Sequence, residues 1–245
     1  MKKLITLIFA TASLFQSCGN DRLKKAKESV QQTTEVAEKD SIEEFHEEFD
    51  YAEEDELYAY PKTGNKAEDF LPKIGIYEIQ YEGKGDLNND GLSDLAVVLR
   101  VKDNKTQARP TLILLQIQNK TYRLDKVSNF VMPIEYNEYD YKLFDTEEIS
   151  IENGELNIKL YGKDNSFGTF KYFGNDLLLS SVEAFYRGAG SQEGIKYDFL
   201  KGEQTTTEID LISDVENPKV TENKNSIDKE KHYFENISII DFFNN

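Results

Sequence analysis

Short apolar segments separated by glycine-containing turns are the feature of this chain that most constrains its fold. After Pro61, these segments either alternate apolar and polar residues or form nearly continuous apolar runs, and both patterns are typical of β-strands. The predicted strands are 74–81, 95–101, 111–117, 122–127, 148–151, 156–161, 167–173, 177–186, 195–200 and 204–211. Strands this short and this closely spaced favour a mainly β domain with antiparallel sheets.

The turns between the later strands predict β-hairpins. Asn153-Gly154 separates two predicted strands, and both residue types tolerate the positive φ that a two-residue hairpin requires. Gly174-Asn175-Asp176 and Lys201-Gly202 separate two further pairs in the same way. The continuous runs 95–101 and 111–117 instead predict central strands that are covered on both faces.

Residues 1–17 have the pattern of a bacterial export signal. Two lysines precede an apolar stretch, 4–14, that is too short to span a bilayer, and Ser17-Cys18 follows. This ending resembles a bacterial lipoprotein signal peptide, which implies that the thiol of Cys18 is acylated and that Cys18 becomes the mature N-terminus. The resemblance predicts a cell-envelope protein anchored by lipid to the outer membrane, on either its periplasmic or its outer face. Ordinary secretion after Ala10-Thr11-Ala12 and a retained anchor are the alternatives.

The rest of the chain divides into a polar tether and one domain. Residues 18–62 are highly charged, and a capping-box pattern within them allows a short helix, so we expect an acidic tether that is a solvated spacer or a helix recruited by a partner. From residue 63 to residue 245 we expect a single mostly β domain. Within it, the polar segment 214–231 is predicted to be an excursion, and 233–243 is a final strand or helix, with strand favoured.

Charge and residue usage exclude several classes of function. A formal net charge of -17 repels phosphate backbones and anionic lipid surfaces, so we expect no nucleic-acid partner. Cys18 is the only cysteine, which excludes an intramolecular disulfide. The two histidines, His46 and His232, lie in polar segments that match neither a zinc site nor a catalytic triad, so we expect no histidine-based catalysis.

Segment 86–94 is the strongest candidate for a metal site. Its sequence, DLNNDGLSD, places oxygen-bearing side chains at the first, third, fifth and ninth positions, and the backbone carbonyl of the seventh residue adds a further oxygen. A glycine at the sixth position permits the sharp turn that such a loop needs. The expected ligands are Asp86, Asn88, Asp90, the carbonyl of Leu92, and Asp94. Three carboxylates in a flexible oxygen cage favour Ca²⁺ over Mg²⁺.

The surroundings of this loop differ from those of an EF-hand. Val97 occupies the position of the EF-hand glutamate, and strands replace the helices. Residues 85–98, GDLNNDGLSDLAVV, instead resemble the calcium loops of FG-GAP and VCBS repeats, which link two strands and build multibladed propellers. Because the loop occurs once, a complete propeller is not expected, and the prediction is a sandwich-like or partial-propeller-like domain.

A longer resemblance involves three further segments. Phe70-Leu71-Pro72, the strand at 110–115 and the stretch YDFLKG at 197–202 resemble a family of uncharacterised secreted bacterial proteins and lipoproteins that carry one such loop. This resemblance implies no particular activity.

The loop points to a structural calcium ion, because protein atoms fill the expected coordination positions and leave none for a substrate. Together with the lack of an assembled catalytic motif, this predicts a non-catalytic binding module with an unknown protein or glycan partner. Three alternatives remain open. The loop is a polar turn whose aspartates cap backbone amides without metal; the protein is an inhibitor or immunity-type protein against a basic toxin or hydrolase; or it is a carboxylate-dependent hydrolase, which a pocket with two facing acids outside the loop would favour.

Overall fold

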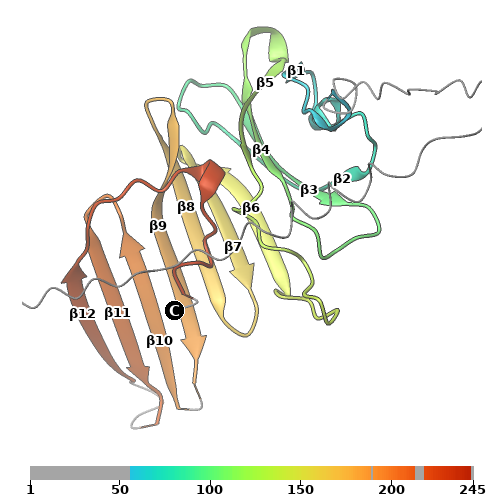
Figure 1. The fold of residues 1–245 in the computed structure, drawn as a ribbon. Coiled ribbons are helices and arrows are strands. Elements are labelled where there is room, and N and C mark those ends of the chain that lie inside the picture. The colour runs from blue at the N-terminus through green and yellow to red at the C-terminus, as the bar shows by residue number, and fades with distance from the viewer. Residues whose placement is uncertain (1–55, 189, 213–217, 244–245) are drawn as a thin grey trace, which may run out of the picture. The chain divides into compact units, whose positions relative to one another are not determined.

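The computed structural model describes residues 56–188, 190–212 and 218–243, and these all belong to one compact unit, Asp50–Asn245. The predicted signal peptide, the predicted lipidation site Cys18 and the tether as far as residue 55 lie outside the described residues. The described part of the chain is mainly β and forms two antiparallel sheets, which confirms the predicted fold class (Figure 1). Over the same residues, no helix has both the length and the apolar character needed to cross a membrane.

The first sheet has five strands in the order β1-β5-β4-β3-β2. Its strands are β1 (Thr63–Gly64), β2 (Tyr77–Gly85), β3 (Asp94–Val101), β4 (Thr111–Gln116) and β5 (Tyr122–Ser128). Two short 3₁₀-helices, η1 (Ala67–Phe70) and η2 (Gln118–Lys120), connect them. The central strands β3 and β4 correspond to the continuous apolar runs of the sequence. Nearly all of their residues are buried, which confirms that they are covered on both faces.

The second sheet is a seven-stranded meander in which each strand pairs with the next one along the chain (Figure 1). Its strands are β6 (Thr146–Glu152), β7 (Glu155–Tyr161), β8 (Asn165–Phe173), β9 (Asp176–Arg187), β10 (Ser191–Asp198), β11 (Glu203–Asp210) and β12 (Lys219–Ser226). The turn between β6 and β7 has positive φ at Asn153 (55°) and Gly154 (74°), as the hairpin prediction requires. Each of the ten strands predicted between residues 74 and 211 overlaps a strand of the structure.

Two apolar cores stabilise the five-stranded sheet, one on each face. One core includes residues of the seven-stranded sheet, and the other includes residues of η1. Strand β3 contributes to both, because successive side chains of a strand point to opposite faces. Ala96 and Val98 belong to the first core, whereas Leu95, Val97 and Leu99 belong to the second.

The two sheets approach each other most closely where β2 meets β6. Gly83 and Gly85 of β2 lie against the backbone of Ile149 and Ile151 of β6. A Cβ atom at Gly85 would overlap the carbonyl oxygen of Ile151, so only glycine fits there. This contact brings the 86–94 loop, which follows Gly85 directly, close to the second sheet.

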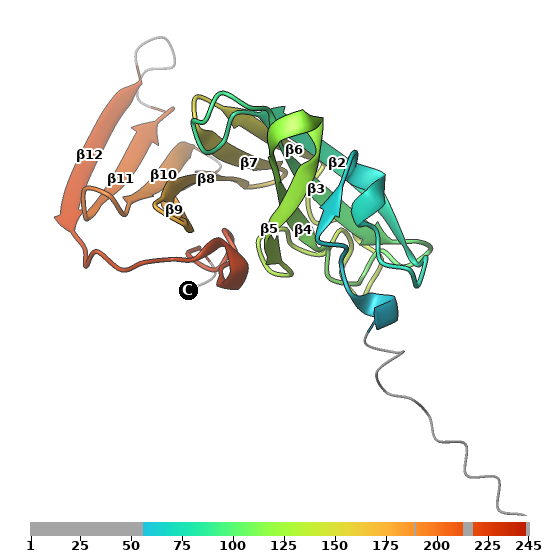
Figure 2. The ribbon, with the colours of Figure 1, turned by 90° about the horizontal axis from the view of Figure 1, so that it is seen from above.

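Two expectations about the end of the chain are wrong. The predicted polar excursion at 214–231 contains β12, which pairs with β11 along its whole length. Its residues are all exposed, so backbone hydrogen bonds rather than an apolar pattern define this strand. The predicted final strand at 233–243 instead contains a 3₁₀-helix, η3 (Phe234–Asn236), followed by turns. After β12 the chain returns across the seven-stranded sheet to η3, which contacts β5 (Figure 2). Residues 233–243 are called the C-terminal segment.

Candidate functional site

The 86–94 loop connects β2 to β3, and its polar groups gather around one turn. The backbone N–H of Asp90 donates to the Asp86 carboxylate and to the Asn88 side-chain carbonyl, each at 3.1 Å. The N–H of Gly91 donates to Asp86 at 2.9 Å, and the Asn88 amide donates to the Asp90 carboxylate at 3.0 Å. Gly91 has a φ of 84°, the left-handed conformation expected at the sixth position. The structure therefore brings the side chains of Asp86, Asn88 and Asp90 together around this turn.

Asp94 has a different environment because it is fully buried. Its Oδ2 atom accepts hydrogen bonds from the N–H groups of Leu87 at 2.8 Å and Asn88 at 3.4 Å, and its Oδ1 atom accepts one from Gln116 at 2.9 Å. Burial raises the pKa of the Asp94 carboxyl, while the three N–H donors act in the opposite direction. Because Gln116 belongs to β4, Asp94 fixes the loop to the five-stranded sheet.

The predicted ligands fit a calcium ion in part. Among the described residues, no three or more His, Cys, Asp or Glu side chains form a group that could hold a metal ion. An ionised carboxylate has about four acceptor positions, so Asp94 keeps about one beside its three hydrogen bonds, and Asp86, Asn88 and Asp90 offer further oxygens. The same hydrogen bonds also describe a polar Asx turn. Calcium binding at this loop, with the Leu92 carbonyl as a further ligand, therefore stays a prediction.

The loop also touches the second sheet through Asn89. This residue has a φ of 60°, and its side-chain amide lies against Gly154 at the tip of the β6–β7 hairpin. A Cβ atom at Gly154 would overlap that amide. An ion bound by the loop would therefore also support the contact between the two sheets. The spacing of the predicted ligands in the sequence does not indicate this second role.

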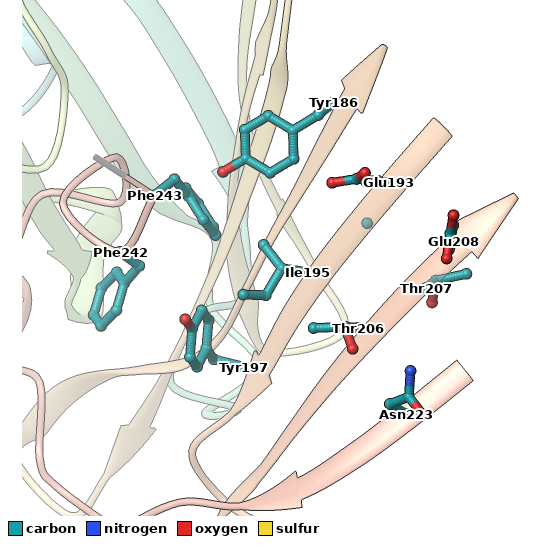
Figure 3. Close-up of a pocket in the computed structure, with 11 residues that line it drawn as sticks. Tyr186, Glu193, Ile195, Tyr197, Thr206, Thr207, Glu208, Asn223, Phe242 and Phe243 are labelled. Carbon is teal, nitrogen blue, oxygen red and sulfur yellow. The ribbon is translucent and has the colours of Figure 1, made fainter. Parts of the chain in front are cut away.

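A groove on the seven-stranded sheet is the second candidate site (Figure 3). Its volume is about 400 Å³, which lies within the range of pockets for small molecules. Tyr186 of β9 borders it on the same sheet face as the core residue Val182, because alternate residues of a strand share a face. Ile195 of β10 is opposite Thr206 of β11, which is in turn opposite Asn223 of β12. Along this face the sheet thus changes from apolar core to polar surface.

The C-terminal segment provides an aromatic wall of this groove. The rings of Phe242 and Phe243 lie with their centroids 5.8 Å and 6.3 Å from that of Tyr197. Phe242 also contacts His232, with ring centroids 5.2 Å apart and ring planes nearly perpendicular. Figure 3 shows Tyr186 and Tyr197 between this wall and the polar strands. Burial raises the pKa of Tyr186, and its phenol, which is protonated at neutral pH as in any tyrosine, can donate a hydrogen bond.

Two acidic residues stand opposite each other in the groove. Glu193 of β10 and Glu208 of β11 are paired in the sheet register, and both are exposed. Over the described part of the chain, neither carboxylate has a hydrogen-bond or ion-pair partner, and no lysine or arginine lines the groove. Two facing acids outside the loop are the arrangement expected of a carboxylate-dependent hydrolase. However, the general acid of such an enzyme needs an apolar environment, whereas these side chains are solvated.

The sequence did not predict the groove residues as functional. Aromatic residues at strand spacing usually belong to a core, which is how Tyr186 and Tyr197 are interpreted from sequence alone. The predicted strand 195–200 also begins two residues after Glu193. It therefore does not show that Glu193, Ile195 and Tyr197 are alternate residues of one strand and share a face. The sequence did contain one signal of the groove, because the strand pair β10 and β11 carries both apolar and acidic residues on one face.

Two candidate sites therefore rest on the geometry of this chain alone. One is the 86–94 loop at the contact between the sheets, and the other is the groove beside β10 and β11. No protein-family model matches the sequence, and neither a curated protein nor a solved structure matches it.

Proposed function

We propose that this protein is a lipid-anchored protein of the bacterial cell envelope and that its β domain is a non-catalytic binding module. The groove between the C-terminal segment and strands β10 and β11 carries the proposal, because it combines aromatic walls with two carboxylates, Glu193 and Glu208, that have no partner among the described residues. Small-molecule sites are typically concave and largely apolar, with a few polar groups that determine specificity. Acylation of Cys18 would hold this groove in the envelope, where glycans, proteins and small molecules are its possible ligands.

Blocking the groove tests the binding function. Ile195→Arg places a long charged side chain in the groove, so we expect it to abolish binding to whichever members of an envelope glycan and protein panel the wild-type chain binds. Val220→Arg is the matched control, because Val220 is an exposed residue of β12 that does not line the groove. Binding that Ile195→Arg leaves unchanged would place the ligand surface elsewhere.

We also propose that the 86–94 loop holds a structural calcium ion through Asp86, Asn88, Asp90, the carbonyl of Leu92, and Asp94. Support comes from the convergence of the first three side chains and from the remaining acceptor position on buried Asp94. With a Kd of about 10 μM and about 1 mM external calcium, binding would add about 2.7 kcal/mol to the free energy of unfolding.

Thermal and calorimetric titration with Ca²⁺ and Mg²⁺ tests this site. We expect Ca²⁺ to raise the melting temperature more than Mg²⁺ does, and Asp90→Ala to remove the difference. Glu82→Ala is the matched control, because it deletes an exposed carboxylate from the strand before the loop. A wild-type chain that does not respond to Ca²⁺ would identify the loop as a metal-free Asx turn.

The lipid anchor is tested in cells. We expect the wild-type chain to incorporate labelled fatty acid and to sediment with outer membranes, because several acyl chains bury many methylene groups. Cys18→Ser removes the acceptor thiol, so the same chain should lose the label and appear in the soluble fraction. Unlabelled wild-type protein would instead favour ordinary secretion.

The facing carboxylates of Glu193 and Glu208 favour a second candidate function, a carboxylate-dependent hydrolase. Turnover on a panel of glycosides that is lost in both Glu193→Gln and Glu208→Gln would establish it, because such enzymes need two carboxylates. Turnover that survives either substitution would exclude this pair as the catalytic residues.

A further inference from the structure

We infer that the ligand of the groove is a small organic cation, an ammonium group carried on an apolar body. This inference rests on the proposed binding function and adds the chemical class of the ligand. It follows from three properties of the groove, which are its two acids without a partner among the described residues, its aromatic walls and its volume.

The acids give the groove a negative potential. Glu193 and Glu208 are directly opposite each other, and like charges at opposite positions of neighbouring strands are unfavourable. Of the residues that the structure describes, no lysine or arginine lines the groove to balance them. The adjoining hollow, which shares Tyr186 and Phe243, contains one acid and one base, Asp164 and Lys163, and therefore does not alter the sign of the charge. A bound cation would relieve the repulsion between the two carboxylates.

The aromatic residues provide the other half of the recognition. Tyr186, Tyr197, Phe242 and Phe243 all line the groove, and the faces of aromatic rings attract ammonium groups. Ile195 lies among them and offers an apolar contact to the body of the ligand. An inorganic cation would leave these apolar surfaces unused, and a neutral ligand would leave the two carboxylates uncompensated. A volume of about 400 Å³ suits a small molecule rather than a folded partner.

Calorimetric titration of the full 245-residue chain in neutral detergent tests the ligand class. The probes are choline against its uncharged analogue 3,3-dimethylbutan-1-ol, and hexylammonium against hexan-1-ol. We expect both cations to bind and both alcohols to bind at least about tenfold more weakly, which corresponds to about 1.4 kcal/mol. A short lysine-containing peptide, compared with the same peptide containing norleucine, distinguishes a free amine from a protein side chain.

Charge-removing variants locate the site. Glu193→Gln and Glu208→Gln should each weaken cation binding about threefold, because both carboxylates are exposed and partly screened by solvent. The double variant should weaken it about tenfold and leave the binding of the alcohols unchanged. Glu222→Gln removes the same charge from an exposed position of β12 that does not line the groove, so it should bind the cations like the wild type. Glutamine keeps the size of the side chain, and circular dichroism confirms that each variant is folded.

Each other outcome overturns the inference in its own way. Equal affinity for cations and alcohols would keep the groove as a binding site and reject charge as the determinant. Cation binding that Glu222→Gln reduces as much as Glu193→Gln would indicate attraction by overall charge alone. Binding of the lysine peptide without choline or hexylammonium would assign the site to a protein partner. If no probe binds, the ligand class is rejected, whereas the binding function is judged separately by Ile195→Arg.

Discussion

Arg109 and Glu147 form a buried ion pair where β6 meets the segment that precedes β4. Both side chains are 1% exposed, and the guanidinium donates two hydrogen bonds to the carboxylate, at 2.6 Å and 2.7 Å. Arg109 also donates to the carbonyl of Pro133 at 2.6 Å and to Gln80 at 3.1 Å. These partners satisfy most of the donors of the guanidinium, so the cost of taking the charges out of water is offset by hydrogen bonds.

Removing one partner of this pair should destabilise the protein strongly. We expect Glu147→Ala to lower the free energy of unfolding by about 3–5 kcal/mol, because it leaves the Arg109 charge buried and unpaired. The neighbouring Glu148 pairs with Lys159 at 3.7 Å on the exposed side of β6, so Glu148→Ala should cost less than about 1 kcal/mol. Urea denaturation of the two variants measures the difference, and equal costs would show that the buried pair stabilises the protein no more than an exposed one.

At the scale of elements, the C-terminal segment is stabilised by side-chain packing rather than by strand pairing. Phe234 and Ile239 are fully buried, and the ring of Phe234 packs edge-on against Phe170 at a centroid distance of 5.5 Å. Ile239 also occupies the space above Gly168 of β8, where a larger residue would collide with it. The segment therefore covers the sheet face from β8 toward β10 and ends at the groove.

The packing of this segment should depend on pH through His232. Burial lowers the pKa of its imidazole, which packs against Phe199 at a centroid distance of 4.4 Å, while Glu230 acts in the opposite direction. The unfolded chain therefore binds more protons near and below pH 6.5, and the free energy of unfolding should fall as the pH drops through that value. Thermal melts between pH 7.5 and pH 5.5 measure this loss, which should be smaller in His232→Gln. His46→Gln is the control, and an equal reduction in that variant would assign the effect to the other histidine.

At the scale of the whole described domain, the chain changes from a two-sided core to a single exposed layer. The five-stranded sheet has an apolar core on each face, whereas every residue of β12 is exposed. The seven-stranded sheet thus loses its apolar cover from β9 toward β12, and residues of β9 to β12 line the groove at this transition.

Hydrogen exchange should reveal this difference in stability. Local opening is easiest where few apolar contacts are lost, so we expect amides of β12 that pair with β11 to exchange much faster than those of β3 and β4. Mass spectrometry of peptides that cover 219–226 and 111–116 compares the two regions. Equal protection would mean that both sheets open only by global unfolding.

The sequence alone identified every strand whose residues have an apolar pattern. Alternating apolar and polar residues indicate a strand with one covered face, and a continuous apolar run indicates a strand covered on both faces, as in β3 and β4. The turn residues Asn153-Gly154 in turn predict the hairpin between β6 and β7. It missed β12, because KVTENKNS has no apolar face to produce such a pattern. It also favoured a strand over a helix at 233–243, because apolar spacing does not distinguish a segment that pairs with a sheet edge from one that crosses a sheet face.

For the candidate sites, the sequence by itself was enough to predict the 86–94 loop, because all five predicted ligands are close together in the chain and their spacing is that of a turn. Only the tertiary structure decided that Asp94 is buried, that Asn89 contacts the second sheet and that a groove exists. The groove combines Glu193, Glu208 and Phe242, which come from two strands and the chain terminus. The pairing register of the strands and the return of the C-terminal segment over the sheet bring these residues together. Neither feature leaves a local pattern in the sequence.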